Sequence, residues 1–180
     1  MSTVPEPPIE RYMKMGGGDL AGCWFDSYGW IACYFAQLEG LSYALIETLG
    51  TAEEKVRAAK LPYQPRTDKA SEIVLRHFTA EGRVALGEEW VAFLAEAKAT
   101  APMRNKILHN PLSVNLALGN PLNDSDVGVV LTREPGKPKL RLGAVQAFSK
   151  HMLDLSLRMQ SLLNRSSLMP IESFAAHGAP

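Results

Sequence analysis

This sequence has no excess of charge of either sign, because 19 Lys and Arg side chains are balanced by 19 Asp and Glu side chains. Proteins that follow a phosphate backbone usually carry an excess of basic residues. The balance therefore argues against tight, non-specific binding of nucleic acid. It leaves room for a small cleft that is locally basic.

Cysteine is also scarce, with only Cys23 and Cys33 in the chain. In a helix, a separation of ten residues corresponds to about 15 Å, which is beyond the reach of a disulfide. We therefore expect two small, buried side chains in a reducing compartment. No group of Cys and His residues has the spacing of a zinc site, so no metal and no cofactor are expected.

Long apolar runs are absent, so we expect no membrane-spanning helix and no membrane partner. Residues 1–18 contain no basic segment followed by an apolar stretch, which excludes a signal peptide and predicts a cytoplasmic protein. This segment is rich in Pro and Gly and is expected to be a flexible leader. Apolar residues make up 46% of the chain, which suffices for one domain over 19–166, followed by a tail over 167–180.

Apolar residues recur at helical spacing over most of that domain. The longest pattern covers residues 20–49, and a second long pattern covers residues 144–165. The first consists of Trp24, Tyr28, Ile31, Phe35, Leu38, Ser42, Leu45 and Leu49, and the second of Val145, Phe148, Met152, Leu155, Met159 and Leu162. We expect these two helices to be the longest and to pack antiparallel.

Shorter helices are expected between them. Thr51 and Glu54 form a capping box for a short helix, which the prolines of segment 61–65 end. Thr67 or Asp68 is expected to cap a third helix.

Gly82 is expected to end that third helix, and Thr100 to cap a fifth helix with Pro102 in its first turn. A fourth helix between them is predicted by the apolar positions Leu86, Trp90, Phe93 and Ala97.

The apolar period changes to two after residue 111, which is typical of strands. Strands are expected near 112–118, 127–132 and 139–142. The sequence thus predicts a mainly α fold, a bundle of about five to six helices with a small antiparallel β-like insert near 112–142.

One segment carries residues suited to chemistry, namely Arg104, Asn105 and His109 on the fifth helix. Arg104 and His109 lie about 140° apart around a helix, whereas Asn105 and His109 share a face. The Arg104 stem is long enough to reach round to the same cleft. An imidazole can transfer a proton and a guanidinium can bind a phosphate through two hydrogen bonds. His77 and His151 have no such partners and are expected to be structural.

The string Arg104-Asn105-x-x-x-His109-Asn110-Pro111 resembles the signature of the HEPN superfamily, in which Arg and a polar residue precede His by a short gap. The order of helices over about residues 20–165 also resembles that family. The resemblance implies a metal-independent endoribonuclease of a toxin–antitoxin, anti-phage or RNA-processing system, with Arg104, Asn105 and His109 as catalytic residues. Glu39, in the first long helix, would be a weaker substrate-binding residue.

The same resemblance implies a homodimer in which two motifs face a shared cleft. RNA or a nucleotide, and a protein such as an antitoxin, are the implied partners. The alternative is a non-catalytic HEPN-like module that binds a nucleotide, RNA or a protein, which the neutral charge favours. Exposed apolar residues are expected to support dimerisation, namely Phe25, Leu41, Leu153 and Leu157.

Overall fold

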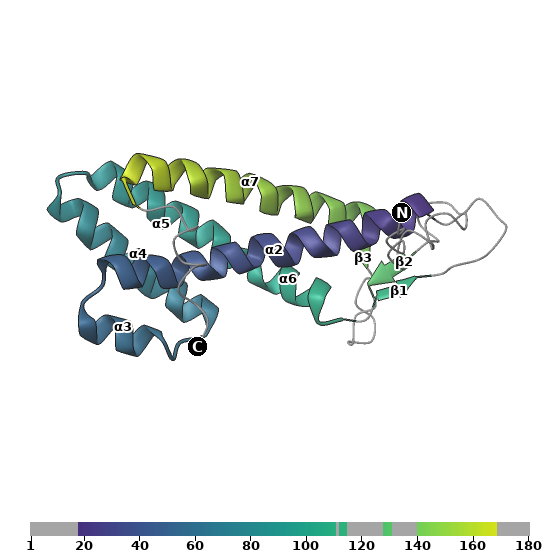
Figure 1. The fold of residues 1–180 in the computed structure, drawn as a ribbon, viewed down its shortest axis with the longest axis horizontal. Helices are drawn as coiled ribbons and strands as arrows, with labels where there is room; N and C mark the ends of the chain where they lie inside the picture. Colours follow the sequence, from purple (N-terminus) through teal and green to yellow (C-terminus); the bar gives the residue numbers. More distant parts are fainter. Residues whose placement is uncertain (1–17, 111, 115–127, 131–139, 169–180) are drawn as a thin grey trace, which may run out of the picture. The chain divides into compact units, whose positions relative to one another are not determined.

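The computed structural model describes residues 18–110, 112–114, 128–130 and 140–168. The fold is mainly helical, as the sequence predicts (Figure 1). The described helices are α2 (Gly18–Leu49), α3 (Ala52–Ala58), α4 (Tyr63–Ala80), α5 (Val84–Ala99), α6 (Ala101–Leu108) and α7 (Leu142–Ser166). The described strands are β1 (Leu112–Val114), β2 (Gly128–Val130) and β3 (Leu140–Arg141).

The chain divides into two compact units. Unit 1 contains residues 1–32 and 103–151, and unit 2 contains residues 33–102 and 152–180. The two long helices, α2 and α7, contribute residues to both units. The predicted domain limits, residues 19 and 166, stay a prediction.

In unit 1, the first turns of α2 and α7 pack with α6 around a small apolar cluster. Its buried members are Trp24, Ile31, Ile107, Leu142 and Val145, and the half-buried side chains packed against it are Tyr28, Leu108, Leu140 and Phe148. The cluster joins the helix that carries the Arg-Asn…His residues to both long helices.

The predicted antiparallel insert is confirmed where it is described. β1, β2 and β3 form a three-stranded antiparallel sheet in sequence order. Ser113 is paired with Val129, and Val130 with Leu140. The rest of the strands predicted at 112–118 and 127–132, and the turns expected at 120–124 and 134–138, lie outside the described residues.

Unit 2 is built around the α4–α5 hairpin, with the later turns of α2 and α7. α4 ends just before Gly82, as predicted, and the φ of 73° at Gly82 suits a residue without Cβ. The Trp90 indole N–H donates a buried hydrogen bond of 2.7 Å to the Ser166 hydroxyl, which fixes the end of α7 to α5. Arg165 forms two further hydrogen bonds with the Glu89 carboxylate.

The two long helices are the longest, as predicted, with 32 residues in α2 and 25 in α7. Their predicted antiparallel packing is wrong. Trp24, early in α2, packs with residues of the first turn of α7, whereas Gln37, later in α2, accepts a hydrogen bond from Ser156, later in α7. The early part of α2 therefore contacts the early part of α7, and the later part contacts the later part, so the two helices run parallel. Apolar spacing shows which face of a helix is buried and carries no information about the direction of its neighbour.

The predicted apolar stripe of α2 is confirmed. Six of its eight members are buried, and Tyr28 and Leu49 are half-buried. Two expectations on this helix are wrong. Leu41, expected outside, is fully buried because the buried face is wider than one stripe, and Cys33, expected inside, is exposed. Nothing is described of the Cys23 side chain.

Two helix starts also differ from prediction. α4 begins at Tyr63 and not at Thr67 or Asp68, because Pro65 lies in its first turn, where the missing N–H costs nothing. Thr100 does not cap α6. Its hydroxyl donates back to the Ala97 carbonyl at 2.6 Å and so extends the end of α5.

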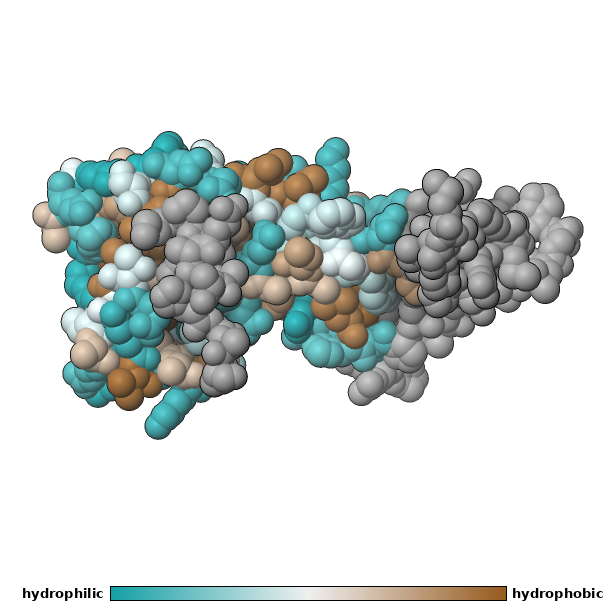
Figure 2. Space-filling model, in the orientation of Figure 1, coloured by the Kyte–Doolittle hydropathy of each residue, from teal (hydrophilic) through white to brown (hydrophobic). Residues whose placement is uncertain are grey.

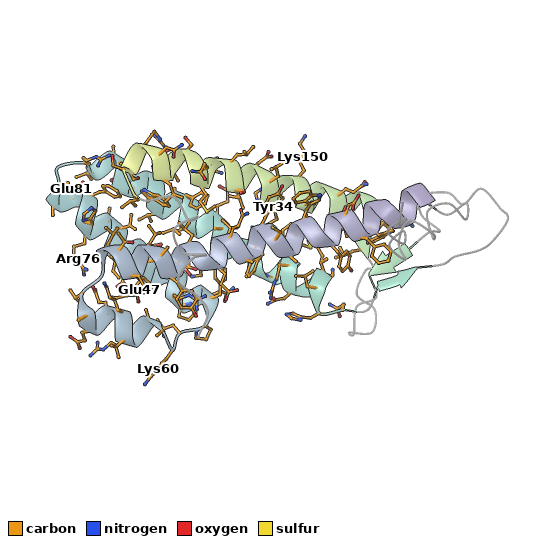
Figure 3. The ribbon with its side chains drawn as sticks, viewed as in Figure 1. Tyr34, Glu47, Lys60, Arg76, Glu81 and Lys150 are labelled. Atoms are coloured by element: carbon orange, nitrogen blue, oxygen red, sulfur yellow. The ribbon has the colours of Figure 1, made fainter. Side chains whose placement is uncertain are left out.

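The capping box at the start of α3 is confirmed in both directions. The Glu54 backbone N–H donates to the Thr51 hydroxyl, and the Thr51 backbone N–H donates to the Glu54 carboxylate. Arg76, labelled on α4 in Figure 3, donates two hydrogen bonds of 2.8 Å to the same carboxylate. The Arg76 guanidinium, and then the Thr51 N–H, lower the pKa of Glu54 well below its usual range.

Glu54→Gln is expected to lower the free energy of unfolding by about 1 kcal/mol near neutral pH, because Gln keeps the cap and removes the charge. A carboxyl whose pKa is lowered by folding stabilises the protein above its unfolded pKa, and the effect is lost as the pH falls below about 4.5. The difference between the two proteins should therefore shrink between about pH 7 and about pH 3 in urea unfolding. Glu53→Gln, in an exposed pair with Arg57, is the matched control and should cost close to nothing. An equal loss at both pH values would contradict the prediction.

Candidate functional site

α6 carries Arg104 and Asn105 in unit 1, and His109 follows directly after its last residue. Ile107 is fully buried in the apolar cluster, and Leu108 packs against it. Arg104 lies about 60° from Ile107 around the helix, between Ile107 and Leu108, which explains why its stem is half-buried. Asn105 and His109 are exposed. The apolar residues of α6 thus fix the position of the polar ones.

The three predicted residues are in contact. Nη1 of Arg104 donates to Oδ1 of Asn105 at 2.8 Å and lies 3.2 Å from Nε2 of His109. The His109 backbone N–H donates to the Asn105 carbonyl at 3.1 Å, which holds His109 in place just after α6 ends. Asn110 closes the helix end, since its side-chain amide donates to the Lys106 carbonyl. The expected reach of the Arg104 stem around the helix is therefore observed.

The contact between Arg104 and His109 joins a cation to an imidazole. A guanidinium has only donors, so a hydrogen bond between these two atoms requires Nε2 of His109 to be the acceptor, in the tautomer with its proton on Nδ1. This arrangement combines a fixed positive charge with an imidazole within hydrogen-bond distance, and Asn105 holds the guanidinium. Such a group can bind an anion and exchange a proton with it.

Glu39, the weaker candidate, has a partner of a different kind in unit 2. Its carboxylate accepts a 3.0 Å hydrogen bond from Arg66, whose side chain is only 2% exposed. Arg66 also donates to the Ser42 hydroxyl and the Leu61 carbonyl, each at 2.9 Å, and its guanidinium lies 3.5 Å from the centre of the Tyr43 ring. Glu39 therefore neutralises a buried charge. This pair could not be predicted from the sequence, because no spacing rule joins residues 27 positions apart.

Two buried polar groups near α6 also escaped the sequence analysis. The Trp24 indole nitrogen and the Tyr28 hydroxyl are buried without a hydrogen-bond partner. Both residues belong to the apolar face that contacts α6, and their rings lie 6.2 Å apart. Burial raises the pKa of the Tyr28 hydroxyl above its usual value of 10.0.

Tyr28→Phe is expected to raise the free energy of unfolding by about 1 kcal/mol, because it removes a buried group that has lost water and gained no partner. A phenol whose pKa is raised by folding costs stability as the pH rises above 10.0, so the gain should grow there. Urea unfolding at neutral and alkaline pH measures both effects. Tyr34→Phe on the same helix is the control, since the Tyr34 hydroxyl is not one of the buried unpartnered atoms. A clear loss of stability in Tyr28→Phe would mean that the hydroxyl has a partner in solution.

A shallow hollow of about 350 Å³ opens in unit 2 between α4 and α5. It is lined by apolar side chains of α5, and Asp68 and Lys98 form an ion pair of 2.6 Å beside them. The motif residues are not part of it. Within the described ranges, no three His, Cys, Asp or Glu side chains gather as a metal site would require.

Comparisons of the chain with family models, with curated proteins and with solved structures found no match. None of the helices in the described part of the chain is both long and apolar enough to cross a membrane.

Proposed function

We propose that this chain is a metal-independent endoribonuclease of HEPN type, with Arg104, Asn105 and His109 as its catalytic residues. One observation supports this proposal most strongly, namely the 3.2 Å contact between the Arg104 guanidinium and the His109 imidazole, with Asn105 in contact with the same nitrogen. The motif's residues thus meet at one point, although their spacing places two of them on different faces of a helix. We place the protein in the cytoplasm, in a toxin–antitoxin, anti-phage or RNA-processing system.

The reaction that suits these groups is an internal transfer on RNA. His109 takes the proton of the 2′-hydroxyl, and the 2′-oxygen forms a bond to phosphorus. The bond from phosphorus to the 5′-oxygen breaks, and that oxygen receives the proton that His109 has taken from the 2′-hydroxyl. Arg104 stabilises the negative charge that gathers on the phosphate oxygens in the transition state. The products are a 2′,3′-cyclic phosphate and a free 5′-hydroxyl, and no metal takes part.

The experiment is incubation of the purified full chain with single-stranded RNA in the presence of EDTA. We expect cleavage products that end in a cyclic phosphate. A DNA strand of the same sequence should remain intact, because it lacks the 2′-hydroxyl that acts as nucleophile. RNA that stays uncut, or DNA that is cut equally well, would end the enzyme proposal.

A non-catalytic binding module is the second candidate, and the balanced charge of 19 basic and 19 acidic residues favours it. A module that holds one phosphate or one nucleotide needs no wide basic surface. Binding of a short RNA without cleavage, reduced in Arg104→Ala, is the result that this candidate predicts. A protein partner such as an antitoxin would be compatible with either candidate.

We also propose that the chain forms a homodimer. Several large apolar side chains are exposed, among them Phe25, Trp30, Leu153 and Leu157. On the face that Figure 2 shows, apolar residues lie in several patches among polar ones. Light scattering at tens of micromolar is expected to give a dimer mass, and Leu157→Lys, at a position that is 62% exposed, should weaken a dimer that uses this side chain. A monomer mass for the parent protein would contradict the proposal.

A further inference from the structure

Ion pairs are distributed unevenly between the two units. Unit 2 contains ten Lys and Arg residues, and nine of them form an ion pair with a carboxylate. Lys60, which is exposed, is the one cation of unit 2 that has no such pair among the described residues. The protein itself therefore neutralises almost all the positive charge of unit 2.

Two cations of unit 1 are not neutralised in this way. Lys106 lies on α6 and Arg141 on β3, and neither has an ion pair with a carboxylate within the described ranges. Only two acidic residues of unit 1 are described, and both, Asp19 and Asp26, lie in the first three turns of α2. Over its whole sequence unit 1 has nine Lys and Arg against seven Asp and Glu, whereas unit 2 has ten against twelve. The zero net charge of the chain thus combines a small basic excess in the unit that carries the motif with an equal acidic excess in the other.

Both cations lie beside the apolar cluster of unit 1. Lys106 directly precedes Ile107, and Arg141 stands between Leu140 and Leu142, and these three apolar residues pack in that cluster. Neighbouring residues of a strand point to opposite faces, so Leu140 contacts the cluster and Arg141 is exposed. The cluster therefore holds the two cations in the same part of unit 1.

The motif lies in this part of unit 1 as well. The His109 backbone N–H donates to the Asn105 carbonyl, so the helical turn continues as far as His109. Residues three positions apart on a helix are neighbours, which places Lys106 beside His109. The sheet joins β3 to the same segment, because β3 pairs with β2, β2 pairs with β1, and β1 begins at Leu112, three residues after His109.

We propose that Lys106 and Arg141 bind backbone phosphates of single-stranded RNA next to the phosphate on which the motif acts, so that the strand runs over the end of α6 and over β3. Each phosphate that a Lys or Arg neutralises releases counterions from the nucleic acid, which favours binding. Lys106 and Arg141 can do this without first losing a carboxylate, whereas the paired cations of unit 2 cannot. This inference rests on the proposed function for the choice of RNA as the polyanion.

The test is binding of a short single-stranded RNA that carries a methyl group on every 2′-oxygen, so that the nucleophile is blocked and the RNA stays intact. Fluorescence anisotropy of the labelled RNA gives Kd for the full chain at several salt concentrations. For single strands, the slope of log Kd against log salt concentration contains about 0.7 for each phosphate contact. We expect Lys106→Gln and Arg141→Gln each to lower this slope by about 0.7 and to weaken binding about fivefold at about 0.1 M salt.

Two other exposed cations without an ion pair among the described residues serve as matched controls (Figure 3). Lys60 belongs to unit 2, and Lys150 lies about 160° around α7 from Phe148, which packs on the cluster. Gln at either position should leave the slope and Kd unchanged. Lys106→Arg and Arg141→Lys should bind as the parent does, because they retain the charge. Urea unfolding should give the parent free energy for all these variants, since none of them removes an ion pair.

Four outcomes would overturn the inference. An unchanged slope in either Lys106→Gln or Arg141→Gln would mean that this charge does not contact a phosphate. An equal loss in Lys60→Gln or Lys150→Gln would mean that binding follows the net charge of the chain and not this surface. A parent protein that does not bind the methylated RNA at tens of micromolar would exclude the contact altogether. Binding to vesicles that contain phosphatidylserine, in place of RNA, would assign the two cations to a membrane surface.

The result is separable from the proposed function. A chain that binds the methylated RNA through Lys106 and Arg141 but leaves ordinary RNA intact keeps this inference and loses the ribonuclease. A chain that cuts RNA with the same KM in the parent and in both Gln variants keeps the ribonuclease and loses this inference.

Discussion

Glu39→Ala is expected to lower the free energy of unfolding by about 2 kcal/mol, the largest loss of stability that we predict. The substitution leaves the Arg66 guanidinium, 2% exposed, without its carboxylate. Removing one partner of a buried ion pair costs about 3–5 kcal/mol. We expect less because the Glu39 side chain is 40% exposed, so water can reach the site, and because Ser42 and Leu61 still accept hydrogen bonds from Arg66.

A double-mutant cycle separates this role from a role in binding substrate. Arg66→Met removes the buried charge and keeps a long stem, so Glu39→Ala should cost much less in that background. Glu47→Ala, on the same helix and in a longer, exposed contact of 3.9 Å with Lys55, is the matched control and should cost little. Urea unfolding gives the free energies of the four proteins of the cycle and of the control. If Glu39→Ala keeps full stability yet loses binding of RNA, Glu39 belongs to the functional site and the structural assignment is wrong.

His109→Ala is expected to reduce the rate of RNA cleavage at least about 100-fold, the usual scale for one general acid–base group. Arg104→Ala should cost a similar factor, because the charge that stabilises the transition state is lost. Asn105→Ala should cost less, since it removes one hydrogen bond to the guanidinium and no reacting group. Single-turnover rates on one RNA substrate allow the three variants to be compared directly.

The control for this series is His77→Ala. His77 lies on α4 and is paired with Glu81 at the end of that helix, so its replacement should have no effect on the rate. None of the motif variants should unfold the protein, because Asn105 and His109 are exposed and Arg104 is only half-buried. Cleavage by His109→Ala at the parent rate would exclude His109 as the base and would direct attention to the binding-module candidate.

The sequence determined the helices and much of the core. The three-and-four spacing of apolar residues in α2 and α7 predicts which side chains are buried, because a helix that lies on a core must turn one face to it. The Thr51–Glu54 capping box and the turn at Gly82 are also local, since each depends on residues only a few positions apart. The alternation of apolar and polar residues after residue 111 is also a local pattern, and it predicted the strands that form the antiparallel sheet.

Proximity within one helix likewise allowed the motif to be predicted. Arg104, Asn105 and His109 are separated by less than two turns, so their meeting required only a long arginine stem. The burial of the Arg104 Nε atom could not be predicted, because it depends on how α6 packs with segments far away in the sequence.

Only the tertiary structure decided the rest. The parallel course of α2 and α7 is seen only in their contacts, because apolar spacing carries no information about the direction of a helix. The burial of Arg66 and its pairing with Glu39 arise because the start of α4 packs on α2, which places a charge away from water and next to the carboxylate that compensates it. Local patterns fix which side of each helix is apolar, whereas the partner of a buried polar group depends on where distant segments meet.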